Sequence, residues 1–172
     1  MDWFRHILDI HAMQAYVNGH AWVWSVCEMI HYVGMSLIVG LIGLLDLRIL
    51  GFCKSLPIGA LKPFVPIAIA GFVANLITGF IFVSGNPVGG PGAYLDNLSF
   101  QCKLVVLGIA FINLVIFRLT GLEHEVYATP ANGDAPGSAK VIAVVSLLSW
   151  AFIIFFGRML MYNDTLLLFL GL

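Results

Sequence analysis

The chain has 172 residues, of which 60% are hydrophobic and only 10% charged, and its formal net charge is −1. Its mean hydropathy is +0.99. A soluble domain of this length cannot bury so much apolar surface, because a small fold keeps a large share of its surface in contact with solvent. The composition therefore excludes an ordinary soluble domain and predicts a lipid bilayer as solvent. The sequence also has no basic stripe, which argues against a nucleic-acid partner.

The N-terminal segment, about residues 2–16, is predicted to form an amphipathic helix that lies in the membrane interface. One face at helical spacing holds Trp3, Ile7, Ile10 and Gln14. Another face holds Asp2, Arg5, His6 and Asp9. These charges interrupt any continuous apolar core, so the segment does not read as a cleavable signal peptide. The alternative is a solvated tail.

Four apolar stretches follow, at about residues 21–45, 64–83, 103–120 and 140–161. Each has about the length that a helix needs to cross the hydrocarbon core. Proline, glycine or polar residues lie between them. No stretch alternates apolar and polar residues, as the strands of a membrane β-barrel do. We therefore expect an all-α fold, an integral membrane four-helix bundle with an interfacial N-terminal helix, and a single membrane domain over residues 1–172.

The distribution of lysine and arginine predicts the orientation, because cytoplasmic loops are enriched in these residues. One side of the membrane would hold Arg48, Lys54, Lys62, Arg118 and Lys140. The other side would hold Arg5, Lys103 and Arg158. The bias favours the first side as cytoplasmic. It predicts a multi-pass protein of a bacterial inner membrane with both termini on the periplasmic side.

The strongest candidate site lies in the first span, where Glu28, His31 and Met35 share one helical face. A neutral imidazole is a good ligand for heme iron, and Glu28 could orient the ring. Lys103 and Arg158 would approach the same side of the membrane, where two cations suit heme propionates, a quinone head group or a lipid phosphate. The alternatives are that His31 bonds to a neighbouring helix and that both cations extend to the interface.

A second axial ligand for the iron is not evident from the spacing. The histidines predicted on the side of His31 are His20, His11 and His6. Met35, Lys103 or an open coordination position are the alternatives. His124 is expected beyond the far end of the third span, too distant to share one heme with His31. In the second span, Asn75 lies between Gly71 and Gly79, a pattern that predicts helix packing rather than a ligand site.

Several segments resemble a bacterial family of uncharacterised four-helix membrane proteins. The segments are Glu28 to Leu37, Gly43 to Gly51, Ala70-Gly71-Phe72, Thr78-Gly79, Asn97 to Lys103, Asn113 and Gly157-Arg158. More distantly, a histidine in the first span and a lysine opening a later one are similar to the heme-binding membrane protoporphyrinogen oxidases and the copper-resistance membrane proteins. This distant similarity implies heme b at His31 and a role for Lys103 near the porphyrin. The close family often has a histidine where this chain has Arg118.

Three functions follow as hypotheses. The first is a heme b electron-transfer subunit that links a periplasmic redox partner, such as a cytochrome, to the quinone pool. The second is a cofactor-free structural or assembly subunit of a larger membrane complex, packing through its small residues. The third is a porphyrin-oxidising enzyme, for which Glu28 and His31 are the only acid–base candidates. The sequence favours a non-catalytic redox or structural subunit.

Overall fold

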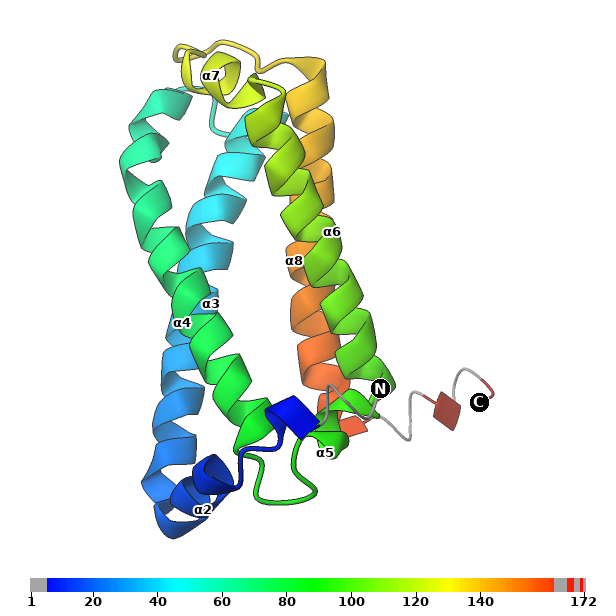
Figure 1. The fold of residues 1–172 in the computed structure, drawn as a ribbon. Helices are drawn as coiled ribbons and strands as arrows, with labels where there is room; N and C mark the ends of the chain where they lie inside the picture. The colour runs from blue at the N-terminus through cyan, green and yellow to red at the C-terminus, as the bar shows by residue number, and fades with distance from the viewer. Residues whose placement is uncertain (1–5, 163–166, 169–170, 172) are drawn as a thin grey trace.

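The computed structural model describes residues 6–162, 167–168 and 171, most of which are helical and none of which forms a β-strand (Figure 1). The long helices are α3 (Ala21–Leu50), α4 (Val65–Ser84), α6 (Leu98–Leu119) and α8 (Gly137–Met159). The short ones are α2 (His11–Gly19), η1 (Ile58–Phe64), α5 (Gly92–Leu95), α7 (Leu122–Tyr127) and η2 (Leu160–Tyr162). All four long helices are long and apolar enough to cross a membrane.

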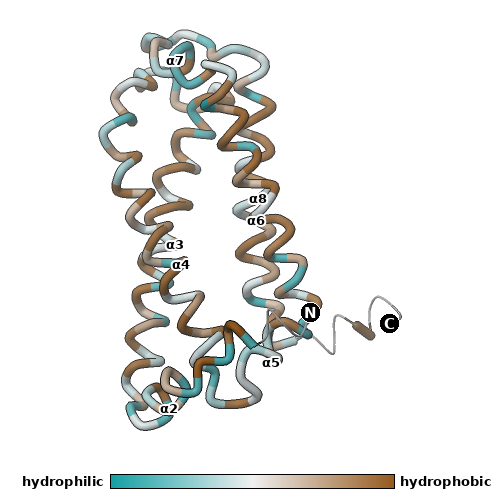
Figure 2. The backbone as a smooth tube through the Cα atoms, viewed as in Figure 1, coloured by the Kyte–Doolittle hydropathy of each residue, from teal (hydrophilic) through white to brown (hydrophobic). Residues whose placement is uncertain are grey.

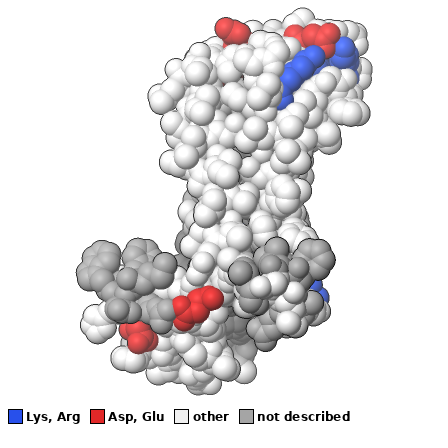
Figure 3. Space-filling model, turned by 90° about the vertical axis from the view of Figure 1, so that its right-hand side faces the viewer, with Lys and Arg blue, Asp and Glu red and all other residues white. Residues whose placement is uncertain are grey.

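The four long helices run antiparallel as two pairs, α3 with α4 and α6 with α8, and α3 also packs against α8 to join the pairs. Helices α2 and α5 lie at one end of the bundle and α7 at the other (Figure 1). Apolar residues dominate the length of the helices, while hydrophilic residues gather toward the two ends (Figure 2). On the face shown in Figure 3, the charged side chains of the described residues lie at the ends and leave the middle bare. The predicted membrane four-helix bundle is confirmed.

Two spans extend beyond their predicted bounds. Helix α3 continues to Leu50 rather than ending near residue 45, because Gly51 is the residue that adopts the left-handed conformation, at φ +106°, and ends the helix. Helix α6 begins at Leu98 rather than near residue 103, because the side chain of Asn97 accepts a hydrogen bond from the Phe100 N–H and caps the first turn. Polar residues at these ends hid the true boundaries from a hydropathy pattern.

The N-terminal segment is not one helix over 2–16. Residues 2–5 lie outside the described part of the chain, the helix is interrupted at residues 9–10, and α2 then continues to Gly19. A Cβ at Gly85, just after α4, would lie 3.0 Å from Val17 Cγ2 and 3.4 Å from Met13 Cγ. Helix α2 therefore turns to pack its apolar side on the end of α4, and this tertiary contact overrides the single periodicity read from the sequence.

Helices α3 and α4 cross in close contact at two glycines. A Cβ added to Gly34 would lie 2.7 Å from the Gly71 carbonyl oxygen, and a Cβ added to Gly71 would lie 2.8 Å from the Gly34 carbonyl oxygen. Small residues are what allow membrane helices to approach at backbone distance. The crossing fixes the register of α3 on α4 and thus the neighbours of His31.

At the α7 end, the Arg48 side chain is fully buried and bonds only to backbone carbonyls in the described residues. Its Nε donates to Leu56 O at 2.5 Å, and its terminal nitrogens donate to Pro130 O at 3.2 Å and Gly133 O at 3.3 Å. A guanidinium can satisfy several acceptors at once through its fixed fork of donors. Arg48, assigned to a loop from the sequence, therefore lies within α3 and holds both loops of this end together.

The same loops are joined at the surface by Asp134, whose Oδ1 lies 2.9 Å from Lys54 Nζ and 3.4 Å from Lys140 Nζ. The hydrogen bond from Lys54, with the nearby Lys140 charge, holds the pKa of the Asp134 carboxyl below its usual value. The carboxylate form is thus favoured in the folded protein.

We expect Gly34→Ala to lower the stability of the bundle by about 1–3 kcal/mol, since the new methyl group forces α3 and α4 apart. Gly40→Ala is the matched control on the same helix, because nothing lies within 4 Å of its Cβ position. It should be neutral or slightly stabilising. Thermal unfolding in detergent, followed by circular dichroism, compares the two variants. Equal melting temperatures would contradict the role of the crossing.

The Asp134 pair should also give a pH dependence. A carboxyl whose pKa is lower in the folded state stabilises fully above its unfolded pKa of about 3.9, and the contribution disappears as the pH falls through the folded value. We therefore expect Asp134→Asn to melt below the wild type at pH 6, with the difference shrinking toward pH 3. A difference in melting temperature that is constant over this range would show that Asp134 acts through something other than its charge.

Candidate functional site

His31 is held by a hydrogen bond across the α3–α4 interface, where its Nδ1 lies 2.7 Å from Thr78 Oγ1. The Thr78 hydroxyl in turn donates to the Ala74 carbonyl oxygen at 2.8 Å. A hydroxyl has one proton to donate, so with that proton on Ala74 the hydroxyl accepts from His31 Nδ1–H. We assign the proton of the neutral ring to Nδ1 from this network, which leaves the Nε2 lone pair unprotonated.

The backbone around His31 is clamped by Asn75 of α4. In the amide orientation that satisfies both partners, Nδ2 donates to the His31 carbonyl at 2.7 Å and Oδ1 accepts from the Met35 N–H at 3.1 Å. This is the packing role that the pattern around Asn75 predicted. Together with the Gly34–Gly71 crossing, it fixes both the main chain and the ring of His31.

Aromatic rings and a glycine surround the imidazole. The Phe82 ring lies edge-on to His31, with ring centroids 5.4 Å apart, and the Trp24 ring follows it at 5.0 Å from Phe82. A Cβ at Gly79 would be 4.0 Å from His31 Cε1, so the absence of a side chain there leaves room beside the ring. The imidazole is therefore half-buried beside apolar rings.

Lys103 of α6 supplies the nearest described cation and is close enough to His31 to act on it electrostatically. The ammonium lies against α8, where a Cβ on Gly157 would be 3.6 Å from Lys103 Nζ. A larger residue at Gly157 would crowd the ammonium. His31 and Lys103, which come from different helix pairs, are therefore brought to the same level of the bundle, as the sequence predicted.

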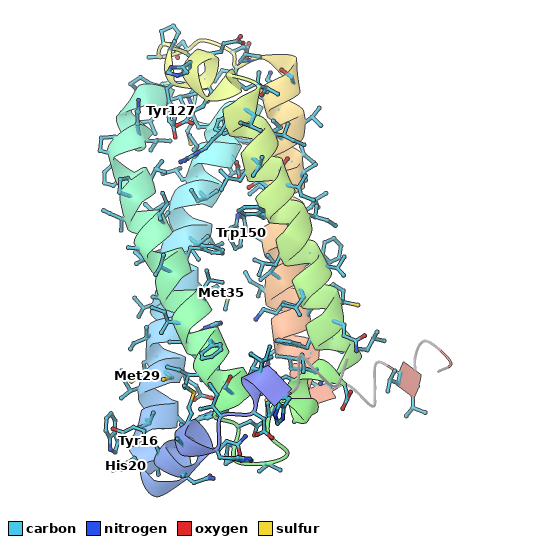
Figure 4. The ribbon with its side chains drawn as sticks, in the orientation of Figure 1. Tyr16, His20, Met29, Met35, Tyr127 and Trp150 are labelled. Carbon is cyan, nitrogen blue, oxygen red and sulfur yellow. The ribbon has the colours of Figure 1, made fainter. Side chains whose placement is uncertain are left out.

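Glu28, Met35 and Arg158 are less closely connected to His31. Glu28 is exposed, and its Oε1 accepts a hydrogen bond from Trp24 Nε1 at 3.1 Å. Burial, reinforced by the Glu28 charge, raises the pKa of Tyr94 in α5, which places Glu28 near that helix. Met35 lies in the space between the two helix pairs, one turn beyond His31 (Figure 4). Arg158 is exposed near the end of α8.

No hydrogen bond or ring contact joins His31 to another histidine in the part of the chain that the structure describes. His20 precedes α3, and its Nδ1–H donates to the Tyr16 carbonyl oxygen at 2.9 Å. Figure 4 shows the two side chains together at the α2 end. The rise of about 1.5 Å per residue separates His20 from His31 by about 16 Å. His11 is 87% exposed and lies 3.8 Å from Asp9. His6 is also exposed, and His124 belongs to α7 at the opposite end.

Within the described residues, no group of three or more His, Cys, Asp or Glu could hold a metal ion. The site does fit one axial imidazole. Its Nδ1–H has an acceptor, which is how protein-bound imidazole ligands are commonly oriented. Its Nε2 is unprotonated, and a cation lies near for an anionic group.

The sequence missed several residues of this arrangement. Thr78 was singled out only as part of the Thr78-Gly79 motif, and Phe82 gave no signal beyond an apolar helix. Gly157 was noticed only as part of a motif. Asp46, a carboxyl inside the first span, lines a cavity between the helices and was not selected, because it lies close to the predicted end of that span.

Comparison of the chain with protein-family models, with curated proteins and with solved structures found no match. The resemblance to four-helix membrane families accordingly stays a prediction from short motifs. The geometry around His31 is what bears on function.

We expect Thr78→Val to destabilise the protein by about 1–3 kcal/mol, because it leaves the buried Nδ1–H of His31 without an acceptor. Thr78→Ser keeps the hydroxyl and should restore most of the loss. Valine matches threonine in size and lacks only the hydroxyl, whereas serine keeps the hydroxyl and lacks the methyl group, so thermal unfolding of both variants in detergent separates the hydrogen bond from packing. A loss in Thr78→Ser with none in Thr78→Val would mean that packing of the Thr78 methyl group, rather than its hydroxyl, matters here.

Proposed function

We propose that this protein is a membrane-embedded heme b electron-transfer subunit with His31 as the axial ligand. The observation that carries the proposal is the hydrogen-bond chain from His31 Nδ1 through Thr78 to the Ala74 carbonyl, from which we assign the ring proton to Nδ1 and leave the Nε2 lone pair unprotonated. An imidazole in this state is ready to bind iron without losing a proton. When bound, heme b supplies one-electron chemistry that no side chain of the site provides.

The residues of the site would each have a separate task. Thr78 orients the ring, and Asn75 and the Gly34–Gly71 crossing hold the helix that bears it. Lys103 offers a positive charge to a propionate, and Gly157 leaves the space in which the ammonium lies. The apolar rings of Phe82 and Trp24 would exclude water on one side.

The distribution of lysine and arginine along the bundle indicates its orientation in the membrane. Lys54, Lys62, Arg118 and Lys140 all lie toward the α7 end, whereas Lys103 and Arg158 lie toward the α2 end. We therefore place the α7 end in the cytoplasm of a bacterial cell, the protein in the inner membrane and both termini on the periplasmic side. His31 then lies in the half of the bundle that faces a periplasmic redox partner such as a cytochrome, and the quinone pool is the second partner.

A second candidate is a cofactor-free structural or assembly subunit of a larger membrane complex. The same contacts support it, because the His31–Thr78 hydrogen bond and the contacts of Asn75 also hold two membrane helices together. Porphyrin oxidation is supported less well, because Glu28 is bonded to Trp24 rather than directed to His31.

A reduced-minus-oxidised absorption spectrum of the purified full-length protein tests the proposal. We expect a b-type α-band that is lost in His31→Ala and retained in His124→Ala, since His124 lies at the opposite end. Thr78→Val should weaken heme retention about 10-fold or more, as removal of a partner of a metal-bound histidine commonly does. Reduction of the band by an added quinol would identify electron transfer.

The opposite results are equally informative. A folded, colourless wild-type protein that does not take up added heme would overturn the proposal and favour the structural subunit. An α-band that survives in His31→Ala would show that a residue other than His31 binds the iron.

A further inference from the structure

A cavity of about 220 Å³ lies between the helices in the half of the bundle toward α7, away from His31. Residues of all four long helices and of α7 line it. Most of the lining is apolar, and the polar side chains that reach it include Asp46, Asn113 and Ser146. In Figure 4 the Trp150 side chain lies in the space between the two helix pairs, above Met35.

Asp46 is the unexplained group of this cavity. Asp46 is only 5% exposed, and its Oδ2 has no hydrogen-bond partner among the described residues. The carboxyl interacts with Ser146 of α8. A buried polar atom left without a partner lowers the stability of the fold, because it has lost its hydrogen bonds to water. A ligand in the cavity would supply the hydrogen bond that the Asp46 carboxyl lacks.

The cavity is open toward the lipid between α4 and α6. Helix α4 packs mainly on α3, and α6 packs mainly on α8, so these two helices form the loosest side of the bundle. Ile69 of α4 and Phe111 of α6 line the cavity and are themselves 48% and 62% exposed. A molecule dissolved in the bilayer could therefore enter sideways, leaving an apolar tail among the lipid chains.

We propose that this cavity binds the ring of a lipid-soluble quinone or quinol and that Asp46 is its hydrogen-bonding partner. A cavity of about 150 Å³ can hold benzene, so the volume suits one substituted ring. Phe72, Phe117 and Trp150 offer aromatic faces and edges to a flat ring. A carboxyl group can accept from a quinol hydroxyl, and in its protonated form it can donate to a quinone carbonyl.

The binding claim is argued from the cavity alone, while use of the bound quinone in electron transfer rests on the proposed function. His31 and Asp46 are both in α3, about 22 Å apart along its axis at about 1.5 Å per residue. The two sites are thus separate, and a variant at one leaves the contacts of the other in place.

Titration of the full-length protein in detergent with short-tailed benzoquinone and naphthoquinone, followed by tryptophan fluorescence, tests the inference. Quinones quench nearby tryptophans, and Trp150 lines the cavity whereas Trp22 and Trp24 lie at the start of α3. We expect saturable quenching by at least one ring type, and the stronger one identifies the quinone class. Trp150→Phe should lose most of the saturable signal.

Three variants examine the residues. Asp46→Leu should weaken binding about 10-fold, which corresponds to the loss of one good hydrogen bond, and Asp46→Asn should stay within about 3-fold of the wild type because its amide can still donate and accept. Ala110→Phe fills the cavity from α6 and should abolish saturable quenching. Ala70→Phe, an exposed position of α4 outside the lining, is the matched control and should bind as the wild type does.

The inference is overturned if neither quinone gives saturable quenching, if Trp150→Phe keeps the full signal, or if Ala110→Phe binds like Ala70→Phe. Should Asp46→Leu fail to fold, Asp46→Asn and Ala110→Phe still decide the matter. Saturable quenching in His31→Ala supports the quinone site even if the protein proves colourless. A b-type band without quenching would refute the quinone site and leave the proposed heme site standing.

Discussion

The close crossing of α3 and α4 at Gly34 and Gly71 is the contact on which the other features of this protein depend. Backbones that meet at this distance have one workable register, because a slip in either direction would bring side chains into carbonyl oxygens. In that register Asn75 reaches the main chain at Met35, and Thr78 reaches the ring of His31. Lipid exerts little hydrophobic force between helices, so close packing and polar contacts of this kind hold the pair.

The bundle has two halves of different character. Toward α2, a histidine, a lysine and aromatic rings converge, which suits a cofactor with an anionic edge. Toward α7, a buried carboxyl borders an apolar cavity that opens to lipid, and the loops beyond it are bound together by the buried Arg48. All four long helices run through both halves, and α3 carries both His31 and Asp46.

Much of the fold could be predicted because the membrane imposes simple rules. Every backbone group in lipid needs a partner, and four long apolar stretches can meet that need only as helices. The juxtaposition of His31 with Lys103 also followed from antiparallel spans. Thr78, in contrast, lies 47 residues from His31 in sequence, and its neighbours in sequence do not distinguish a hydroxyl that bonds only to its own helix from one that also holds a ring.

The sequence by itself determined the number of spans, their apolar surfaces and the presence of an ionisable group at membrane depth, because these depend on composition and local periodicity. Only the tertiary structure decided which side chains meet. In the folded protein the N-terminal helix is interrupted and Val17 packs on the end of α4, while His20 bonds to Tyr16 rather than to His31. Arg48 is buried, and Asp46 lies beside a cavity. Each outcome depends on how separate helices pack and cross, which no single segment encodes.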